Sequence, residues 1–415
     1  MTRPAPSPVP ESHRPTRREL RDLYFDEPLH RLGRRAVEMT GRLHPEAYRT
    51  YVVDRNINYA NWCTARCTFC NFKADPPDMP SARRGLPPGY TLTFEQIGEK
   101  IEGLLEIGGT QLLMQGGLVP TDGKIGLPFD WYLDLMRFIK RCYPQVHVHA
   151  FSPPEIFAFH QRFGMSVRDI LARLQEAGLE SVPGGGAEIL SDRVRKKISI
   201  GKTDTAQWLE VMRQCHILGM RTSCTMMFGH VETLDERFEH LELLRDLQDE
   251  SVARNNGGGF GAFICWPFQP AGTPLGRTKP LPIKQPETPN EVPNEANPLA
   301  VHSSQFAIRS SAKLLNDGNH LLLADAHEYL TMLALSRLAL DNIPNIQSSW
   351  VTMGPKIGQL ALFSGANDMG SVMMEENVVS AAGTTFSVNE AQIRRLIADA
   401  GFRPQKRDYY YRPID

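Results

Sequence analysis

The chain has 415 residues, of which 41 % are hydrophobic and 22 % charged, a balance that suits a globular protein with a large core and no membrane-spanning segment. Its 46 basic and 47 acidic side chains leave a net charge of −1, so no overall field favours nucleic acid or an anionic membrane. We therefore expect a small-molecule substrate and no nucleic-acid or membrane partner, whereas the composition leaves the oligomeric state open.

The N-terminal segment, residues 1–20, is rich in proline and arginine and lacks an apolar stretch of signal-peptide length. It predicts a disordered tail on a cytoplasmic protein. The seven cysteines are an odd number, and four of them are scattered among apolar neighbours (Cys142, Cys215, Cys224, Cys265). Such a distribution favours reduced thiols over a disulfide framework.

Short apolar runs then alternate with segments of helical period, which is the pattern of repeated βα units. The predicted strands cover residues 56–61, 111–115, 146–151, 181–184, 222–228 and 261–266. The predicted helices between them cover residues 93–107, 129–141, 167–177, 206–218 and 234–247. This alternation indicates an α/β fold, a (β/α) TIM-type barrel with six core βα units, whose functional residues lie at the C-terminal ends of the strands.

A proline-rich segment over residues 276–299 cannot form a regular element and predicts an exposed insertion. It separates a core with an N-terminal extension, residues 21–275, from C-terminal units in residues 300–415 that we expect to close the barrel. Candidate elements of those units are residues 304–315, 346–352, 356–363 and 372–374, followed by a last helix at 388–400 and an edge strand at 408–412.

Three cysteines lie directly after the first predicted strand with the spacing C-x3-C-x2-C: Cys63, Cys67 and Cys70. One loop with such short spacings can wrap a [4Fe–4S] cluster, and three thiolates leave one of the four irons without a protein ligand. The alternatives are a structural zinc site and chance clustering. Zinc normally takes four ligands, and no His or Cys follows Cys70 at finger-like spacing.

With Phe69 in the aromatic position before the last cysteine, this motif resembles that of the radical S-adenosylmethionine (SAM) superfamily. The resemblance implies that the open iron binds SAM, and that an electron from a donor such as flavodoxin or ferredoxin leads to a 5′-deoxyadenosyl radical. Two positions beside the motif depart from the pattern: Trp62 replaces a small aliphatic residue, and residues 71–73 replace an Ala-Phe-Tyr-like triplet.

Further stretches resemble one subgroup, the futalosine-pathway enzymes of menaquinone biosynthesis and their deazaflavin-synthase relatives: residues 115–118, 149–155, 183–188 and 227–232. Residues 54–59 and 262–270 look most like the cyclic dehypoxanthine futalosine synthases. That resemblance implies an oxidoreductase that abstracts a ribose hydrogen from dehypoxanthine futalosine and closes the sugar onto the benzoate ring. The alternatives are an aminofutalosine synthase, a deazaflavin (FO) synthase component, and a non-catalytic iron–sulfur or zinc protein.

Several strand-end residues are candidates for cofactor binding beside Phe69: Gln115, Gly116, Gly117, Ser152, Gly185 and Glu188. Glycines there let the backbone approach a ligand and offer N–H groups, although a simple turn would also explain them. By resemblance, the stretch at Gly116 and Gly117 binds the methionine part of SAM, but Leu118 stands where many relatives have glutamate.

The candidate catalytic residues are His149, which shares a face of its strand with His147, and His230 and Glu232 after the fifth strand. Hydrogen-bonded core histidines and loop structure are the alternatives for these positions. Arg55 and Tyr59 are candidate substrate-binding residues, because a guanidinium suits the substrate carboxylate. An ordinary surface ion pair explains Arg55 equally well.

Overall fold

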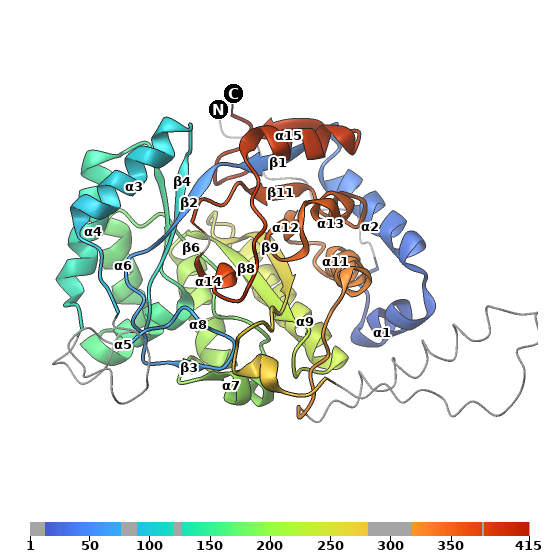
Figure 1. The fold of residues 1–415 in the computed structure, drawn as a ribbon, viewed down its shortest axis with the longest axis horizontal. Helices are drawn as coiled ribbons and strands as arrows, with labels where there is room; N and C mark the ends of the chain where they lie inside the picture. The colour runs from blue at the N-terminus through green and yellow to red at the C-terminus, as the bar shows by residue number, and fades with distance from the viewer. Residues whose placement is uncertain (1–12, 76–88, 119–125, 281–317, 376, 415) are drawn as a thin grey trace, which may run out of the picture.

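The computed structural model describes residues 13–75, 89–118, 126–280, 318–375 and 377–414. Its main sheet has ten strands in the order β12-β1-β11-β10-β9-β8-β6-β5-β4-β2, all pairs parallel (Figure 1). The strands are β1 Tyr48–Val52, β2 Asp54–Asn58, β4 Gln111–Gln115, β5 His147–Ala150, β6 Ser181–Val182, β8 Arg221–Phe228, β9 Gly259–Pro267, β10 Asn345–Gln347, β11 Asp368–Ser371 and β12 Arg403–Lys406.

β2 lies at one end of the strand order, and β1 lies next to the other end. These two strands meet in the chain, because only Val53 separates them. β1 pairs with β11, and just beyond β11 the Asn56 N–H donates a hydrogen bond of 3.0 Å to the carbonyl of Met374. The curled sheet therefore returns to its own starting strand, with β12 alongside β1. The expected TIM-type barrel, closed by C-terminal units, is confirmed.

Helices cover the outside of the sheet (Figure 1). Those between barrel strands are α3 Phe94–Glu106, α4 Phe129–Cys142, α5 Pro153–Phe163, α6 Val167–Ala177, α7 Asp192–Ile198, α8 Thr205–Ile217, α9 Leu234–Arg254 and α11 Ala326–Ala339. Several begin where the sequence supplies a capping box, as at Thr93, Asp204 and Thr233, whose side chains accept the backbone N–H three residues later.

The remaining elements are short or lie at the ends of the chain. They are α1 Arg17–Asp26, α2 Leu29–Leu43, α12 Trp350–Met353, α13 Pro355–Leu360, α14 Asn377–Ser380, α15 Glu390–Asp399, the 3-10 helices Leu275–Arg277 and Ala361–Phe363, and an antiparallel pair formed by β3 Arg66–Cys67 and β7 Ser199–Ile200. Among the described residues, no helix is long and apolar enough to cross a membrane.

The N-terminal helices serve the core by covering α11, which is buried all along its length from Glu328 to Ala339. A helix that is buried on every side needs partners on every side, and α1 and α2 pack against α11 opposite the barrel.

The predicted disordered tail over residues 1–20 was wrong at its C-terminal end. Residues 17–20 form the first turn of α1, and Leu20 is fully buried; residues 1–12 lie outside the described part.

Several predicted element boundaries differ from the structure. The first strand spans residues 54–58 rather than 56–61, and β1 before it was missed. Residues 356–363, predicted as one element of the closing βα units, are helical, and the expected edge strand at 408–412 is a turn that follows β12. Short apolar runs fit either a strand or a buried helix, which explains these errors. Residues 304–315 and most of the insertion at 276–299 lie outside the described residues.

Candidate active site

The barrel interior contains a cavity of about 440 Å³. Its lining begins at the cysteine loop after β2 and ends at the segment after β12, where Arg407, Tyr409 and Tyr411 form the floor. Arg407 is fixed there by a buried ion pair with Asp368, in which Nε lies 2.5 Å from Oδ2. The C-terminal segment thus closes the lower end of the barrel, and the cysteine loop lies at the upper end.

All three predicted cluster ligands line this cavity. Backbone hydrogen bonds hold their loop on both sides: the Cys63 N–H donates to the carbonyl of Ala74 (3.2 Å), and the Thr68 N–H donates to that of Ile198 (2.9 Å). Cys67 lies in β3, which pairs with β7. The loop is therefore a supported part of the fold.

The chemistry of the three thiols fits an iron–sulfur cluster. The Leu118 N–H donates to Cys63 Sγ at 3.2 Å, a contact that favours a thiolate. Burial raises the pKa of the Cys67 thiol to about 12 and also raises that of Cys63. A bound metal favours the thiolate form of such thiols. Three cysteine thiols that line one cavity are the ligand set that a [4Fe–4S] cluster with one open iron takes.

The predicted cofactor-binding residues surround the same cavity as the cysteines: Phe69, Gln115, Gly116, Gly117, Ser152, Gly185 and Glu188. The two glycines after β4 allow very close packing. A Cβ on Gly117 would lie 1.9 Å from the carbonyl oxygen of Trp62, and one on Gly116 would lie 2.3 Å from Cζ of Tyr59. The end of β4 thus lies directly against the cysteine loop.

Glu155, which the sequence reasoning missed, joins several of these residues. Its Oε1 accepts from the Tyr59 hydroxyl (2.6 Å) and the Gly116 N–H (2.8 Å), and its Oε2 accepts from Ser152 Oγ (2.7 Å). The carboxylate is 1 % exposed and lines the cavity. Its position three residues after the helix cap Ser152 was the available signal.

Lys202 is a second missed residue. Its Nζ donates to Glu188 Oε1 at 2.9 Å and lies 5.3 Å from the centroid of the Phe69 ring. Glu188 itself has a left-handed backbone with φ of +43°. A lysine and a glutamate therefore face the cavity beside the aromatic residue of the cysteine loop, a pairing suited to a charged ligand.

Arg55 and Tyr59, the predicted substrate-binding residues, are not among the residues that line the cavity. Successive side chains of a strand point to opposite faces, and in β2 it is Asn56 and Asn58 that line the cavity. Arg55 lies on the outer face, where it donates to Glu375 (2.7 Å) and to the carbonyl of Lys100 (2.8 Å). Tyr59 lies on that face too, with its hydroxyl bonded to Glu155.

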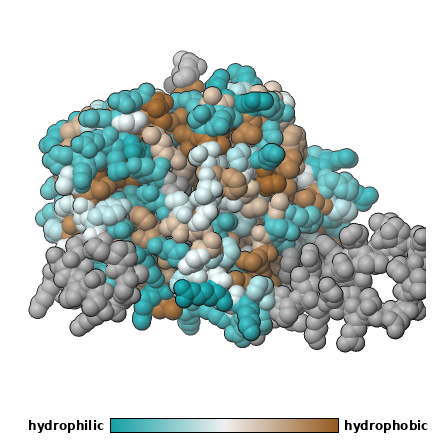
Figure 2. Space-filling model, viewed as in Figure 1, coloured by the Kyte–Doolittle hydropathy of each residue, from teal (hydrophilic) through white to brown (hydrophobic). Residues whose placement is uncertain are grey.

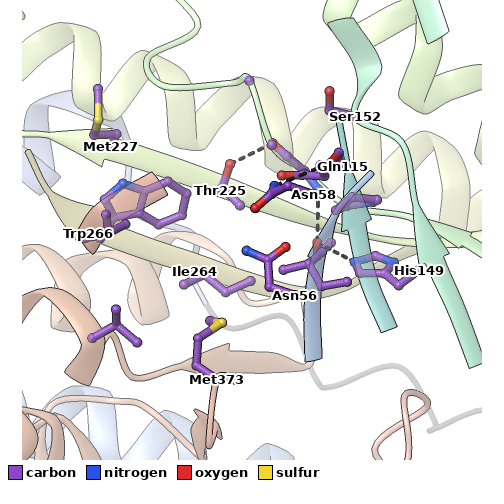
Figure 3. Close-up of a pocket in the computed structure, with 18 of the residues that line it drawn as sticks. Asn56, Asn58, Gln115, His149, Ser152, Thr225, Met227, Ile264, Trp266 and Met373 are labelled. Carbon is purple, nitrogen blue, oxygen red and sulfur yellow. Dashed lines mark hydrogen bonds between the residues drawn. The ribbon is translucent and has the colours of Figure 1, made fainter. Parts of the chain in front are cut away.

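His149 lines the cavity, as expected for the inner face of β5 (Figure 3). Its Nδ1 lies 2.7 Å from Ser181 Oγ, and its Nε2 lies 3.4 Å from Ser223 Oγ. Burial, assisted by His147, lowers the pKa of His149 well below its usual range. The imidazole is therefore neutral and has a hydroxyl at each nitrogen.

His230 and Glu232, the other two predicted catalytic residues, are not among the residues that line the cavity. Both are fully buried behind the end of β8. Glu232 accepts the backbone N–H groups of Gly229 (2.6 Å) and His230 (2.9 Å) and Nε of Arg237 (2.8 Å). Although burial acts to raise it, His230 and Arg237 hold the pKa of Glu232 below its usual range. The pair stabilises the turn from β8 to α9.

Solved structures of low sequence identity share this fold. Methylornithine synthase (PylB) matches with a TM-score of 0.61 and 16 % identity over 95 % of each chain. The FeFe-hydrogenase maturase HydG from Carboxydothermus hydrogenoformans matches with a TM-score of 0.64 and 14 % identity, over 96 % of this chain and 78 % of that one.

Sequence relatives cover almost the whole chain. The cyclic dehypoxanthine futalosine synthase of Halalkalibacterium halodurans is 40 % identical over 94 % of this chain and 89 % of its own, and that of Streptomyces coelicolor is 36 % identical over 95 % and 84 %. The 5-amino-6-(D-ribitylamino)uracil–L-tyrosine 4-hydroxyphenyl transferase of Methanothermobacter thermautotrophicus is 36 % identical over 88 % and 85 %.

Two family models match separate parts of the chain. The model of the CofH/MqnC C-terminal region matches residues 308–415, which include β10 to β12 and the cavity floor. The model of the radical SAM superfamily matches residues 57–244, which include the three cysteines and the strand ends around them. The chain belongs to the radical SAM superfamily and is an enzyme of that type.

Proposed function

We propose that this enzyme cyclises dehypoxanthine futalosine to cyclic dehypoxanthine futalosine, a step of menaquinone biosynthesis, with a [4Fe–4S] cluster on Cys63, Cys67 and Cys70. The two synthases named above support this substrate, since they align over nearly the whole chain. When bound, the cluster and SAM supply a 5′-deoxyadenosyl radical, the chemistry of this superfamily. A flavodoxin or ferredoxin is the proposed electron donor.

The observation that carries the proposal is the division of the cavity into two unlike walls. Figure 3 shows polar side chains on one side and apolar side chains on the other. The polar wall includes Asn56, Asn58, Gln115, His149 and Thr225, and the apolar wall includes Met227, Ile264, Trp266 and Met373. Dehypoxanthine futalosine has a hydroxylated sugar at one end and an aromatic ring at the other, so it matches both walls.

The chain's own residues have three tasks in this reaction. The apolar wall excludes water from a reactive radical and packs against the ring. Glu155 fixes the backbone of Gly116 beside the cysteine loop. After ring closure, the substrate radical becomes the product by losing one proton and one electron. His149 is the proposed acceptor of the proton, at Nε2, because its imidazole is neutral and Nε2 lies farther from its hydroxyl neighbour than Nδ1 does. The one-electron redox partner takes the electron.

The decisive experiment supplies the reconstituted enzyme, without oxygen, with SAM, a reductant and dehypoxanthine futalosine. We expect 5′-deoxyadenosine and a product lighter than the substrate by two hydrogens in mass spectrometry. In parallel, the same enzyme receives tyrosine and 5-amino-6-(D-ribitylamino)uracil, and separately an enolpyruvyl benzoate. Turnover of either parallel substrate, with dehypoxanthine futalosine untouched, would replace the proposal with a transferase or an aminofutalosine synthase.

A further inference from the structure

Asn56 is a cavity-lining residue with a buried polar atom whose partner the described fold does not supply. Its side chain points into the cavity from the middle of β2 and the residue is 5 % exposed (Figure 3). Its Oδ1 is shielded from solvent and has no hydrogen-bond partner in the described part of the chain. Burying an amide without a partner costs about 1–3 kcal/mol. Because Asn56 also lines the cavity, a ligand is the partner that this oxygen can gain.

Gln111 on the adjacent strand also has a buried side-chain oxygen without a hydrogen-bond partner among the described residues. Gln111 lies opposite Asp54 in the pairing of β2 with β4, and Asn56 is two residues further along the same face. Gln111 Nε2 donates to Asp54 Oδ2 at 3.1 Å, so the carboxylate fixes which way the amide points. Its Oε1 is buried and has no partner among the described residues. Two residues that line the cavity from neighbouring strands therefore each have a buried acceptor oxygen without a partner among the described residues.

The surroundings select the kind of group that these oxygens accept from. Asp54 lies between them in the register, and its carboxylate accepts from Gln111 and from the Ser371 hydroxyl. Acceptor oxygens without partners accept hydrogen bonds from O–H or N–H donors of a ligand. Sugar hydroxyls are donors of this kind.

We propose that Asn56 and Gln111 form a hydroxyl-binding subsite that holds the sugar of the substrate against the polar wall. This inference rests on the proposed function, because it assigns the sugar end of dehypoxanthine futalosine to β2 and β4. The aromatic ring then lies toward Trp266 and Met373 on the opposite wall. The subsite thereby determines the orientation in which the substrate binds.

The first test compares two buried asparagines, Asn56→Leu and Asn345→Leu. Asn345 is 3 % exposed, and its Nδ2 donates to the carbonyl of Gly261 (2.8 Å) while its Oδ1 accepts from Asn367 (2.9 Å). Asn56→Leu replaces an amide without partners by an apolar group of similar size. We expect the melting temperature of substrate-free Asn56→Leu to equal or exceed that of the wild type, and that of Asn345→Leu to fall by several degrees.

The second test measures substrate recognition in the reconstituted enzyme. We expect Asn56→Leu to raise KM by roughly 10-fold or more, which is the effect of one lost hydrogen bond in a buried site. A substrate analogue that lacks one ribose hydroxyl should be impaired to a similar degree with the wild type. If that hydroxyl is the partner of Asn56, the two losses should not add when variant and analogue are combined.

The outcomes separate the two proposals. If the wild type turns over dehypoxanthine futalosine but Asn56→Leu has an unchanged KM, or the two losses add for every ribose hydroxyl tested, the subsite is overturned and the function stands. If the wild type leaves this substrate untouched, the proposed function fails. The melting comparison does not depend on the substrate, and a destabilised Asn56→Leu would identify Asn56 as a structural residue.

Discussion

Individual side chains at the cavity mouth have separable roles. The thiols of Cys63, Cys67 and Cys70 line the cavity from one loop, whereas Glu155 accepts hydrogen bonds from groups before and after that loop. Backbone hydrogen bonds of Cys63 and Thr68 help to hold the loop. Ligation and folding can therefore be tested apart.

Cys67→Ser should abolish cluster binding without unfolding the barrel. A hydroxyl of serine is a poor iron ligand at this position because it stays protonated, whereas the backbone pairing of β3 with β7 is unaffected. We expect loss of iron and of 5′-deoxyadenosine formation, measured by iron assay and chromatography, with an apoprotein melting temperature within a few degrees of the wild type.

Cys142→Ser is the matched control for this substitution, because Cys142 is an exposed thiol at the end of α4. It should retain iron and deoxyadenosine formation. Retention of a full cluster by Cys67→Ser would contradict the ligand assignment.

Among the elements, the contact between the end of β4 and the cysteine loop leaves no room for a side chain at Gly117. Gly117→Ala would place a methyl group 2.9 Å from Cβ of Cys63 and closer still to the backbone at Trp62. The loop must then move, and we expect iron content and turnover to fall by at least 10-fold. Iron per chain and the rate of deoxyadenosine formation are the measurements.

Gly41→Ala in α2 provides the comparison for Gly117→Ala, since nothing lies within 4 Å of the added methyl group. Alanine is the better helix former, so this variant should gain about 0.5–1 kcal/mol of stability and keep full activity. Equal activity of the two alanine variants would show that the β4 contact is not required for the cluster.

The same elements show what could be predicted from the sequence. Cysteine spacing and glycines at strand ends are local signals, and they identified residues that line one cavity, from Cys63 to Glu188. The sequence did not predict which side chains of β2 point into the barrel, because polar residues occupy both faces of this strand. Arg55 points outward and Asn56 points inward. In a barrel with a polar interior, alternation of polarity does not distinguish the two faces.

The positions of His230 and Glu232 could not be predicted either, for a different physical reason. His230 and Glu232 lie at the active end of β8, where catalytic residues are common, yet they satisfy the backbone of a turn. Whether a polar residue meets a ligand or a backbone N–H is decided by the path of the chain after the strand. That path is set by tertiary packing, here by Arg237 and α9, and leaves no local pattern in the sequence.

Across the whole molecule, buried histidines make stability depend on pH. Burial lowers the pKa of His44 and of His147 to about 4, and that of His216 and of His240 to about 3, from 6.5. The folded state keeps these groups neutral while the unfolded chain protonates them. The contribution of these histidines to the free energy of unfolding is therefore fully present above about pH 6.5. It falls as the pH drops towards 4, by up to about 1.4 kcal/mol per pH unit for each histidine.

Urea denaturation at several pH values between 7.5 and 4.5 measures this dependence. We expect His216→Asn to reduce the slope of unfolding free energy against pH, because it removes one of these groups. At higher pH the variant should be less stable than the wild type, since the imidazole nitrogens lie 2.6 Å from Ser251 Oγ and 2.8 Å from Thr222 Oγ1. A wild-type stability that stays constant from pH 6.5 to pH 4.5 would contradict the expectation.

The closing of the barrel by its last strands has a consequence for biosynthesis. Thr50 in β1 donates to Asp368 in β11, 318 positions later, and β12 pairs with β1 from further along still. During translation β1 has neither neighbour until these strands leave the ribosome. Closure is thus an event of high contact order, so we expect its rate to be limited by the meeting of distant segments rather than by local helix formation.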